Sequence, residues 1–419
     1  MEKLQIIVGG FLGLLPAGGI TWDYVQYPLG LSQLGHDVYY IEDTRLYPIY
    51  QKPGSDWNDA SYAVTHLRQV MDYFGLTGKW AYRDEASGKC FGLPESRVKE
   101  ICKTADVFIN LSCSTFLREE YARIPARALI DSDPMFTQIQ YSSEQMFTPG
   151  EAGGLRRMID GHNYLFTFGE NIGAAGCRIP TCNLHWHTTR QPVCLDRWKV
   201  LPWVPDFSAA SFTTLMNWTA GKRLQHRGES WGQKDIEFRK FIHLPQEVGG
   251  LQLSAIINQT GGTGEAFPRQ EIEAAGWKLP DGESNAGNWL QYRQFIGQSL
   301  GEFSVAKETY VKAVTGWFSC RSACYLATGR PVVTQDTGWS QTIPSGTGLL
   351  AFTDLESAKE ALLRVMHDYR QHARQARAIA EESFDSRKVL TRMLDQMHSS
   401  NSPGGTINQQ EALRNAGSP

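Results

Sequence analysis

Short apolar runs that end in polar or glycine residues recur along this chain, and they limit its fold more than any other feature. The first forty residues show the pattern. The runs LQIIVGG (4–10) and VYYIED (38–43) flank a glycine-rich loop and a helical segment, YVQYPLGLSQLGHD (24–37). A strand, a helix and a second buried strand in this order form a βαβ unit with parallel strands. The opening therefore predicts an α/β fold.

Three later runs extend the same pattern through the first half of the chain. They are ADVFINLS (105–112), RALIDSD (127–133) and NYLFTFGE (163–170). Each ends in polar or glycine residues, as the carboxyl ends of parallel strands do at a ligand crevice. We expect one α/β domain over residues 1–195.

The second half predicts a further α/β domain over residues 196–385. Its expected strands are FTTLMNW (212–218), LQLSAII (251–257), RQFI (293–296), PVVTQ (331–335) and GLLAF (348–352). The proline- and tryptophan-rich stretch 192–205 is the expected connection, because 419 residues are too many for one core. We expect a helix over 386–398 that packs back on the first domain, and a disordered tail over 399–419.

The net charge of −3, with 20% charged residues, is typical of a globular protein that does not bind nucleic acid nonspecifically. Nucleic acid is therefore not an expected partner. Glu2 and the break at Pro16 disfavour a signal peptide, and no later run is long enough to span a membrane. We expect a cytoplasmic protein whose eight cysteines are reduced.

The segment 301–339 carries the strongest signal for chemistry. Ser304 is placed to cap a helix that runs through Lys307 and Tyr310. Ser319 is placed to cap a second helix that holds Arg321 and Ser322 in its first turn. A cation at that end opposes the helix dipole, so a bound phosphate would explain Arg321 better than helix stability does. The alternative is that Ser319 only caps the helix and Arg321 pairs with a surface carboxylate.

Two blocks resemble the GT-B glycosyltransferases, with a C-terminal domain like that of group 1 or family 4. They are ACYLATGRPVVTQDTGWSQTIPSGTGLLAFTDLESAKEAL (323–362) and PAGGITWDYVQYPLGLSQLGHDVYYIED (16–43). The resemblance implies two Rossmann-like domains that face each other across a cleft. It also implies a nucleotide-sugar donor on the C-terminal domain, an acceptor on the N-terminal domain and a glycine loop at Gly18 and Gly19.

The chain departs from that family at one motif. Many retaining members carry a Glu-x7-Glu pair around the donor helix, and the second Glu binds the ribose of the nucleotide. Here that second position is Cys324, and the first position is not acidic either. We therefore expect ribose binding to be arranged differently, and the anomeric outcome does not carry over.

The resemblance places the loop TQDTGWS (334–340) beside the donor sugar. Asp336 would accept hydrogen bonds from sugar hydroxyls, Thr337 and Gly338 would offer backbone N–H groups, and Trp339 would offer an apolar face. An Asx-turn is the alternative for Asp336. Candidates for binding the donor or its diphosphate are Lys307, Ser319, Arg321 and Ser322, with Lys222, Arg223 and Lys234 as further phosphate ligands. Solvated surface charge is the alternative for the last three.

The candidate base that activates the acceptor is Asp23, which would begin the first helix. A helix cap explains it equally well, and Asp131 and Asp133 are further carboxylates at a strand end. Cys177, Cys182, His185 and His187 are metal-ligand types, but their spacing fits no tight zinc site. We expect neither a metal nor another cofactor.

The sequence thus predicts a metal-independent hexosyltransferase that moves a sugar from a nucleotide donor to a small-molecule or glycan acceptor. One alternative is a nucleotide-sugar epimerase of the same fold. Another is a catalytically silent nucleotide- or sugar-binding protein, which the missing Glu pair keeps open. A dinucleotide oxidoreductase is weaker, because the first loop, GGFLGLLPAGG, is not a GxGxxG motif.

Overall fold

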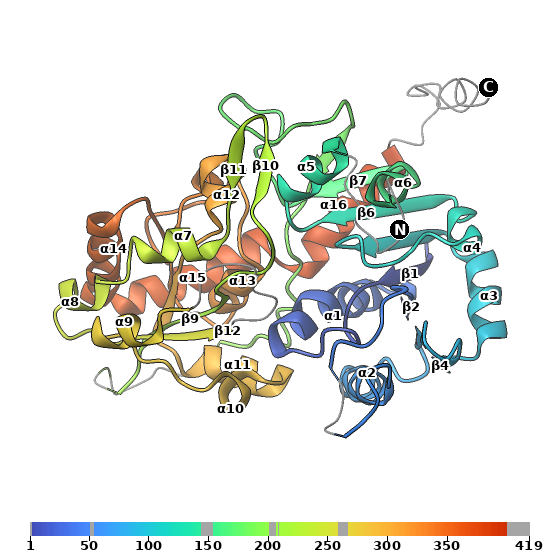
Figure 1. The fold of residues 1–419 in the computed structure, drawn as a ribbon, viewed down its shortest axis with the longest axis horizontal. Coiled ribbons are helices and arrows are strands. Elements are labelled where there is room, and N and C mark those ends of the chain that lie inside the picture. Colours follow the sequence, from blue (N-terminus) through green and yellow to red (C-terminus); the bar gives the residue numbers. More distant parts are fainter. Residues whose placement is uncertain are drawn as a thin grey trace.

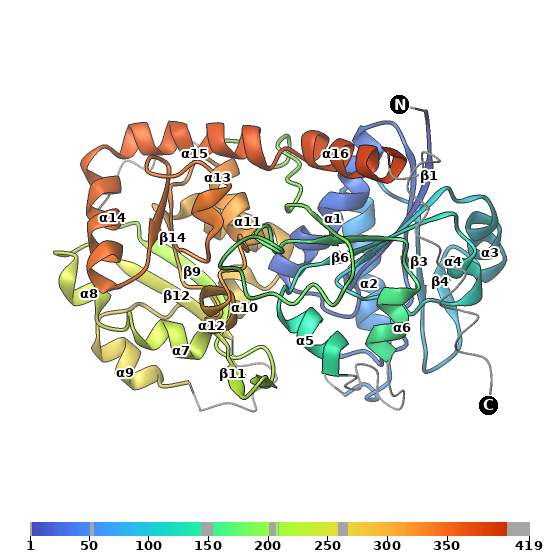
Figure 2. The ribbon, with the colours of Figure 1, turned by 90° about the horizontal axis from the view of Figure 1, so that it is seen from above.

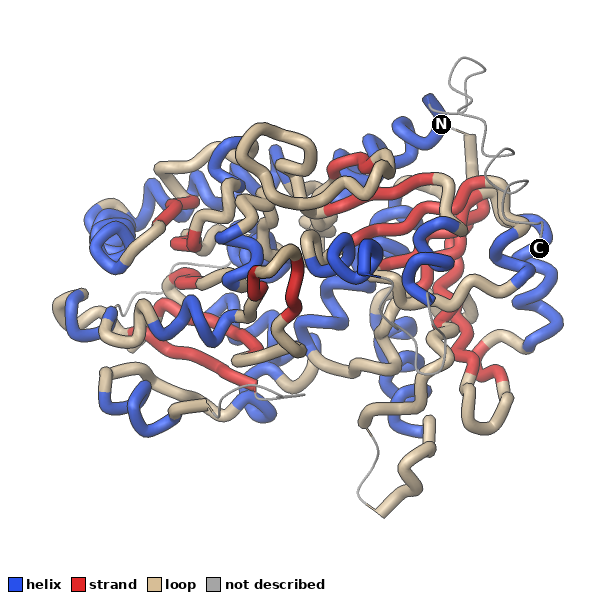
Figure 3. Tube along the Cα trace, turned by 45° about the horizontal axis from the view of Figure 1, so that its top comes forward, coloured by secondary structure: helices blue, strands red, loops and turns tan. Residues whose placement is uncertain are grey.

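The chain folds around two separate parallel sheets, one in each half. The structure, a computed structural model, describes residues 2–50, 54–143, 154–200, 207, 209–258 and 267–399. The expected disordered tail, apart from Ser399, lies outside these residues. Figure 1 shows the first half in blue and green at the right and the second half in yellow and red at the left. Figure 3 shows the strands in red within both halves.

The sheet of the first half has the strand order β4-β3-β2-β1-β5-β6-β7-β8, and every pair except β3 with β4 is parallel. Its strands are β1 (Gln5–Gly9), β2 (Asp37–Glu42), β3 (Trp80–Arg83), β4 (Cys90–Gly92), β5 (Val107–Leu111), β6 (Ala126–Asp131), β7 (Tyr164–Thr167) and β8 (Trp186–Thr188). Its helices are α1 (Gly18–Gln33), α2 (Ser61–Tyr73), α3 (Glu95–Thr104), α4 (Glu119–Ala122), α5 (Phe136–Ser143) and α6 (Gly154–Asp160). Strand β5 is buried along its whole length, as a strand covered on both faces must be.

The sheet of the second half is parallel throughout, with the order β12-β9-β13-β14-β15. Its strands are β9 (Phe212–Asn217), β12 (Leu253–Asn258), β13 (Gly301–Ser304), β14 (Val332–Gln335) and β15 (Leu349–Phe352), and a hairpin of β10 (Leu224–His226) and β11 (Glu229–Trp231) stands apart. The helices are α7 (Lys234–Arg239), α8 (Leu244–Glu247), α9 (Arg269–Ala274), α10 (Gly282–Ala286), α11 (Trp289–Gln298), α12 (Glu308–Lys312), α13 (Cys320–Ala327), the 3-10 turn η1 (Trp339–Gln341), α14 (Leu355–His367), α15 (Tyr369–Ser383) and α16 (Ser386–Ser399). The expected α/β fold is confirmed.

Two element predictions in the second half are wrong. The run RQFI (293–296) lies in α11, which begins at an Asn288 capping box whose side chain accepts hydrogen bonds from the N–H groups of Leu290 and Gln291. Ser304, which was expected to cap a helix, is instead the last residue of the central strand β13, and the helix that follows begins at Glu308 with Lys307 as its N-cap. A four-residue apolar run does not distinguish strand from helix by periodicity, and the cap at Asn288 was the overlooked signal.

The chain crosses between the halves along two segments that run side by side. The Val193 N–H donates to the Phe384 carbonyl at 2.7 Å, and the Ser386 N–H donates to the Val193 carbonyl at 2.9 Å. Beyond this crossing α16 packs against α1, where a Cβ on Gly30 would lie 2.6 Å from Leu390 Cδ1. Figure 2 shows α15 and α16 along one edge of the molecule, spanning both halves. No helix in the described ranges has the length and apolar character needed to cross a bilayer.

Helix α1 joins the two halves into one packed body. Trp22 Nε1 donates to the Trp289 carbonyl at 2.9 Å, and the rings of Trp22 and Trp198 lie 4.5 Å apart. Val25 of α1 and Tyr325 of α13 belong to the same hydrophobic core. The halves are therefore closed on each other, with α1 as the central contact.

This contact predicts that Gly18→Ala destabilises the protein. A Cβ on Gly18 would lie 2.5 Å from the Asn288 carbonyl oxygen, a backbone atom that cannot move aside independently. Overpacking costs about 1–3 kcal/mol, and the better helix propensity of alanine returns at most about 1 kcal/mol. The matched control is Gly221→Ala, where the added Cβ meets nothing within 4 Å. A lower midpoint of thermal unfolding for Gly18→Ala than for Gly221→Ala is expected, and equal midpoints would contradict the close contact.

Candidate active site

Asp23 lies in the second turn of α1 and faces the second half of the chain. Its side chain is half-buried, and this burial raises the pKa of the Asp23 carboxyl to about 7, against the opposing effect of the Arg321 guanidinium across the interface. Gln191 links α1 to α13 beside Asp23. Its Nε2 donates to the Asp23 carbonyl at 2.9 Å, and its Oε1 accepts from Cys320 Sγ at 3.3 Å. A carboxyl that titrates near neutral pH can accept and return a proton under physiological conditions.

Arg321 stands in the first turn of α13, but its side chain turns toward the sheet. The guanidinium donates to the fully buried Glu302 of β13, to the Leu215 carbonyl of β9 and, at 2.6 Å, to Ser304 Oγ. All three guanidinium nitrogens are thus occupied. Residues of two strands, β9 and β13, thus fix Arg321. The alternative predicted from the sequence was a pair with a surface carboxylate, but the carboxylate of Glu302 is buried.

Lys234, the first residue of α7, is a half-buried cation without a counterion of its own. Burial lowers the pKa of Lys234 well below its usual range, and the nearby charges of Arg321 and Lys307 lower it further, with Glu302 opposing. Within the described ranges no hydrogen bond or ion pair holds its ammonium group. A bound anion would stabilise the charged form of this lysine.

Lys307 precedes α12 and makes an ion pair across the interface. Its ammonium group contacts the Asp133 carboxylate, which also accepts a hydrogen bond from the Tyr310 hydroxyl. Burial raises the pKa of Asp133, but Lys307 and Tyr310 lower it by more. Asp133 follows β6 of the first half, so this pair also holds the two halves together.

Lys234, Lys307 and Arg321 come from three different elements and converge on the interface that Asp23 faces. Glu302 pairs with Arg321, and Asp133 pairs with Lys307. The two carboxylates offset two of the three cations, so Lys234 is the member of the cluster without a counterion. An arrangement of this kind can bind a phosphate group and stabilise negative charge that develops on a leaving group.

The loop that was expected to face the sugar is largely engaged within the protein. Asp336 accepts from the Gly338 N–H at 2.7 Å and from Ser340 Oγ at 2.6 Å, which is the Asx-turn alternative. Trp339 is 1% exposed, and its Nε1 donates to the Gln335 carbonyl. The prediction of an open apolar face at Trp339 is wrong, because the ring fills the core beside Phe318.

The glycine turns near α13 meet the first half of the chain at Asn171. The Asn171 Nδ2 group donates to the carbonyls of Val314 and Gly338 at 3.2 Å each. Gly316 and Gly338 have positive φ angles, and a Cβ on either would lie within 3.0 Å of Asn171. Thr337 is buried, and its hydroxyl donates to the Trp317 carbonyl. These turns hold the closed arrangement.

Ser319 and Ser322 lie at the start of α13 as expected, but their side chains do not make the contacts predicted for a helix cap. Ser319 occupies the N-cap position without a hydrogen bond from its side chain to the helix. Ser322 is fully buried, and its hydroxyl has no partner among the described residues. A buried hydroxyl without a partner is costly.

The remaining predicted ligands are spread over the interface and the surface. Gly18 and Gly19 do not form an open loop, because they are the first two residues of α1 and pack against Asn288 and Tyr292. Lys222 is exposed, and Arg223 donates to Asp235 at 3.0 Å. Neither is brought as close to Arg321 as Lys234 is.

Asp131, the alternative base, has a structural role. It is buried and accepts from Thr137 Oγ1 at 2.6 Å, Gln138 Nε2 at 2.8 Å and Thr167 Oγ1 at 2.8 Å. The described residues contain no group of three or more His, Cys, Asp or Glu side chains placed to hold a metal ion. The rings of His185 and His187 meet edge to face, with their centroids 4.6 Å apart.

Sequence analysis missed three residues that shape this site. Glu302 was overlooked because the residues before Ser304 were not expected to form a strand. Tyr310 carries no sequence signal that distinguishes it from a core tyrosine. Gln191 lies just before the expected connection, and its role depends on the interface alone. Only Glu302 had a usable signal, an acidic residue inside an apolar run, which in a buried strand requires a cationic partner.

Comparison with solved structures identifies the fold. An alpha-glucosyltransferase in complex with UDP and a 13-mer DNA containing an HMU base superposes with a TM-score of 0.56 at 10% identity, over 95% of this chain and 100% of that one. Sucrose-phosphate synthase from Thermosynechococcus elongatus gives 0.52 at 11% identity over 95% and 100%, and a glycosyltransferase from Rickettsia africae gives 0.51 at 10% over 96% and 100%. The chain has the GT-B fold. No protein-family model and no curated protein sequence matches it.

The comparisons contradict the expectation that nucleic acid is not a partner. Four of the matching structures are alpha-glucosyltransferases in complex with DNA. The GT-B fold therefore accommodates DNA in other proteins. Net charge is a poor guide here, because it says nothing of how charge is distributed around a cleft.

The raised pKa of Asp23 predicts a pH-dependent stability that Asp23→Asn removes. The folded protein retains the proton up to about pH 7, whereas the unfolded chain loses it near the ordinary aspartate pKa of about 4. Stability of the native protein should therefore fall as the pH rises from 5 to 8. The measurement is the unfolding midpoint across this range for both proteins. Parallel pH profiles would show that Asp23 has an ordinary pKa.

Proposed function

We propose that the protein is a glycosyltransferase that moves a hexose from a nucleoside diphosphate sugar to a hydroxyl or other nucleophile of an acceptor. Lys234 carries the proposal, because it is a half-buried cation without a counterion beside Arg321 and Lys307. The diphosphate of the donor would supply the missing negative charge. The GT-B fold supports this assignment, since UDP or UDP-glucose is bound in alpha-glucosyltransferases of the same fold.

The residues divide the chemical work as follows. Asp23 would take the proton of the acceptor nucleophile as that atom attacks the anomeric carbon. The bond from the anomeric carbon to the diphosphate oxygen breaks, and Lys234 with its neighbours stabilises the charge on the departing diphosphate. The closed interface would exclude water, which otherwise hydrolyses the donor. Because the cluster supplies positive charge itself, we propose that transfer needs no metal, and activity should survive EDTA.

Lys234→Met should weaken UDP binding by about 10- to 100-fold, since hydrogen bonds to charged groups contribute about 1.5–3 kcal/mol. The measurement is the rise in the unfolding midpoint with UDP, which at a hundred times its Kd adds about 2.7 kcal/mol of stability. Lys103→Met on the exposed face of α3 is the matched control. A UDP-induced shift that is unchanged in Lys234→Met would remove the diphosphate site from this cluster.

Asp23→Asn should lower transfer from UDP-glucose by about 10²- to 10⁴-fold while UDP binding is retained. Transfer is measured as UDP release together with the mass of the product, over acceptors that include neutral glycans and the 13-mer DNA with an HMU base. Full activity of Asp23→Asn would exclude it as the base. UDP binding without turnover would identify a silent binding protein, and a nucleotide-sugar with an altered hexose would identify an epimerase.

A further inference from the structure

Large exposed side chains gather in one segment of the first half, between β2 and the start of α2. Trp57 is 66% exposed, Ile49 55% and Tyr47 49%, and Tyr50 and Tyr62 are exposed as well. The rings of Tyr47 and Trp57 lie 4.9 Å apart. In Figure 1 this segment runs beside α2 at the lower edge of the molecule. Apolar surface concentrated in this way marks a binding surface more often than it occurs by chance.

A groove of about 490 Å³ begins at Asn58, the residue after Trp57, so the exposed rings border the groove and do not line it. Its walls are the first turns of α2, from Ala60 to Arg68, and the turn between β3 and β4, from Asp84 to Lys89. Binding sites for small molecules fall in the range of about 300–1,000 Å³. The side chains of Asn58, Arg68 and Lys89 line the groove and make no hydrogen bond or ion pair with other residues that the structure describes. They are available to bond a ligand.

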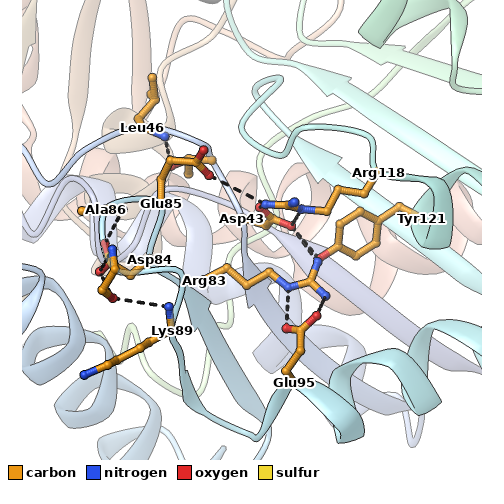
Figure 4. A network of polar contacts seen from close by, with 12 residues as sticks. Asp43, Leu46, Arg83, Asp84, Glu85, Ala86, Lys89, Glu95, Arg118 and Tyr121 are labelled. Carbon is orange, nitrogen blue, oxygen red and sulfur yellow. Dashed lines mark hydrogen bonds and ion pairs between the residues drawn. The ribbon is translucent and has the colours of Figure 1, made fainter.

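Polar contacts hold the two walls of the groove. At the start of α2 the Ser61 N–H and hydroxyl donate to the Asp59 carboxylate at 2.9 and 2.7 Å. Figure 4 shows the contacts around the turn between β3 and β4. Asp43, where the aromatic segment leaves β2, accepts from Arg83 at 2.8 Å and from Arg118 at 2.6 and 2.9 Å. Asp84 accepts from the N–H groups of Ala86 at 3.3 Å and Ser87 at 3.0 Å and so fixes the opposite turn. The Lys89 side chain points away from this network. The groove is thus preformed, which limits the entropy lost when a ligand binds.

The charges of the groove favour a neutral ligand. Its lining carries two carboxylates, Asp59 and Asp84, and two cations, Arg68 and Lys89. A site for a nucleic-acid backbone collects cations without matching acids, because its affinity comes mainly from phosphate contacts. Exposed aromatic rings beside balanced polar groups suit a ligand with both apolar faces and hydroxyl groups. A saccharide ring has both, since its C–H faces pack on aromatic rings and its hydroxyls bond to polar side chains.

The groove lies at the same edge of the sheet as the candidate base. Val64 and Thr65 line it, and the next residue, His66, lies 3.1 Å from Thr21 Oγ1 of α1. Thr21 precedes Asp23 by two residues. Helix α1 would therefore separate an elongated ligand in the groove from the reacting centre at Asp23.

We propose that this groove binds a neutral oligosaccharide, which is the acceptor of the transfer reaction, with Tyr47 and Trp57 as its stacking platform. That the oligosaccharide is the acceptor rests on the proposed function, but its binding to the groove does not require turnover. The groove would hold the acceptor chain at a distance from the hydroxyl that reacts.

The test is an array of neutral glycans probed with the full chain, followed by titration of the best glycan against the intrinsic tryptophan fluorescence. Trp57→Ala should weaken binding by at least tenfold, Tyr47→Ala by less, and Leu363→Ala, an exposed apolar residue of α14, should leave it unchanged. Affinity should be the same at 50 and 500 mM salt. The UDP-induced rise in the unfolding midpoint is measured on the same variants and should be unaffected.

Three outcomes would overturn the inference. They are no binding to any neutral glycan of the array, glycan binding that Trp57→Ala leaves intact, and salt-sensitive binding of a dT12 oligonucleotide that Trp57→Ala abolishes. If any of these is observed while UDP still raises the unfolding midpoint, the groove is excluded as a glycan site but the proposed function stands. Glycan binding that depends on Trp57, in a protein whose unfolding midpoint is raised by none of UDP, GDP, dTDP and ADP, supports the groove as a glycan site and removes the proposed function.

Discussion

The close contact between helix α1 and the second half of the chain is the interaction on which the rest of the structure depends. Three helices of that half, α11, α13 and α16, pack against α1, and glycines at positions 18 and 30 allow the approach. Trp22 anchors the contact with a hydrogen bond to the backbone at Trp289. Because the contact fixes how α1 is turned, it also brings Asp23 to face Arg321.

The electrostatics of the site follow from that closure. Desolvation at the interface raises the pKa of Asp23, and the same desolvation lowers the pKa of Lys234. Neither shift would persist if the halves moved apart and water entered, since burial is the larger cause of both. Opening would also break the ion pair of Lys307 with Asp133 and the hydrogen bonds of Asn171. A donor could thus enter an open form and complete the cluster as the halves close.

The aromatic groove and the cationic cluster meet different chemical needs. The cluster is half-buried and contains a lysine without a counterion, which suits a diphosphate. The groove is open, balanced in charge and bordered by aromatic rings, which suits a longer neutral molecule. Both lie near α1, at the carboxyl-end edge of the first sheet, where loop residues escape the constraints of the core. In the proposed function, the donor and the acceptor would therefore bind at separate places on one fold.

The sequence by itself determined the α/β class, the parallel strands and the segments that hold Lys234, Lys307 and Arg321, because apolar periodicity and helix starts are local properties. Tertiary structure decided which candidates meet. Trp339 was expected to contact the donor sugar but lies in the core. The strand β13, which carries Glu302, was not predicted, because Ser304 was expected to cap a helix. The pairing of Asp133 with Lys307, and the approach of Asp23 to Arg321, join residues far apart in the chain. No local pattern encodes such contacts, since they depend on how two sheets close around one helix.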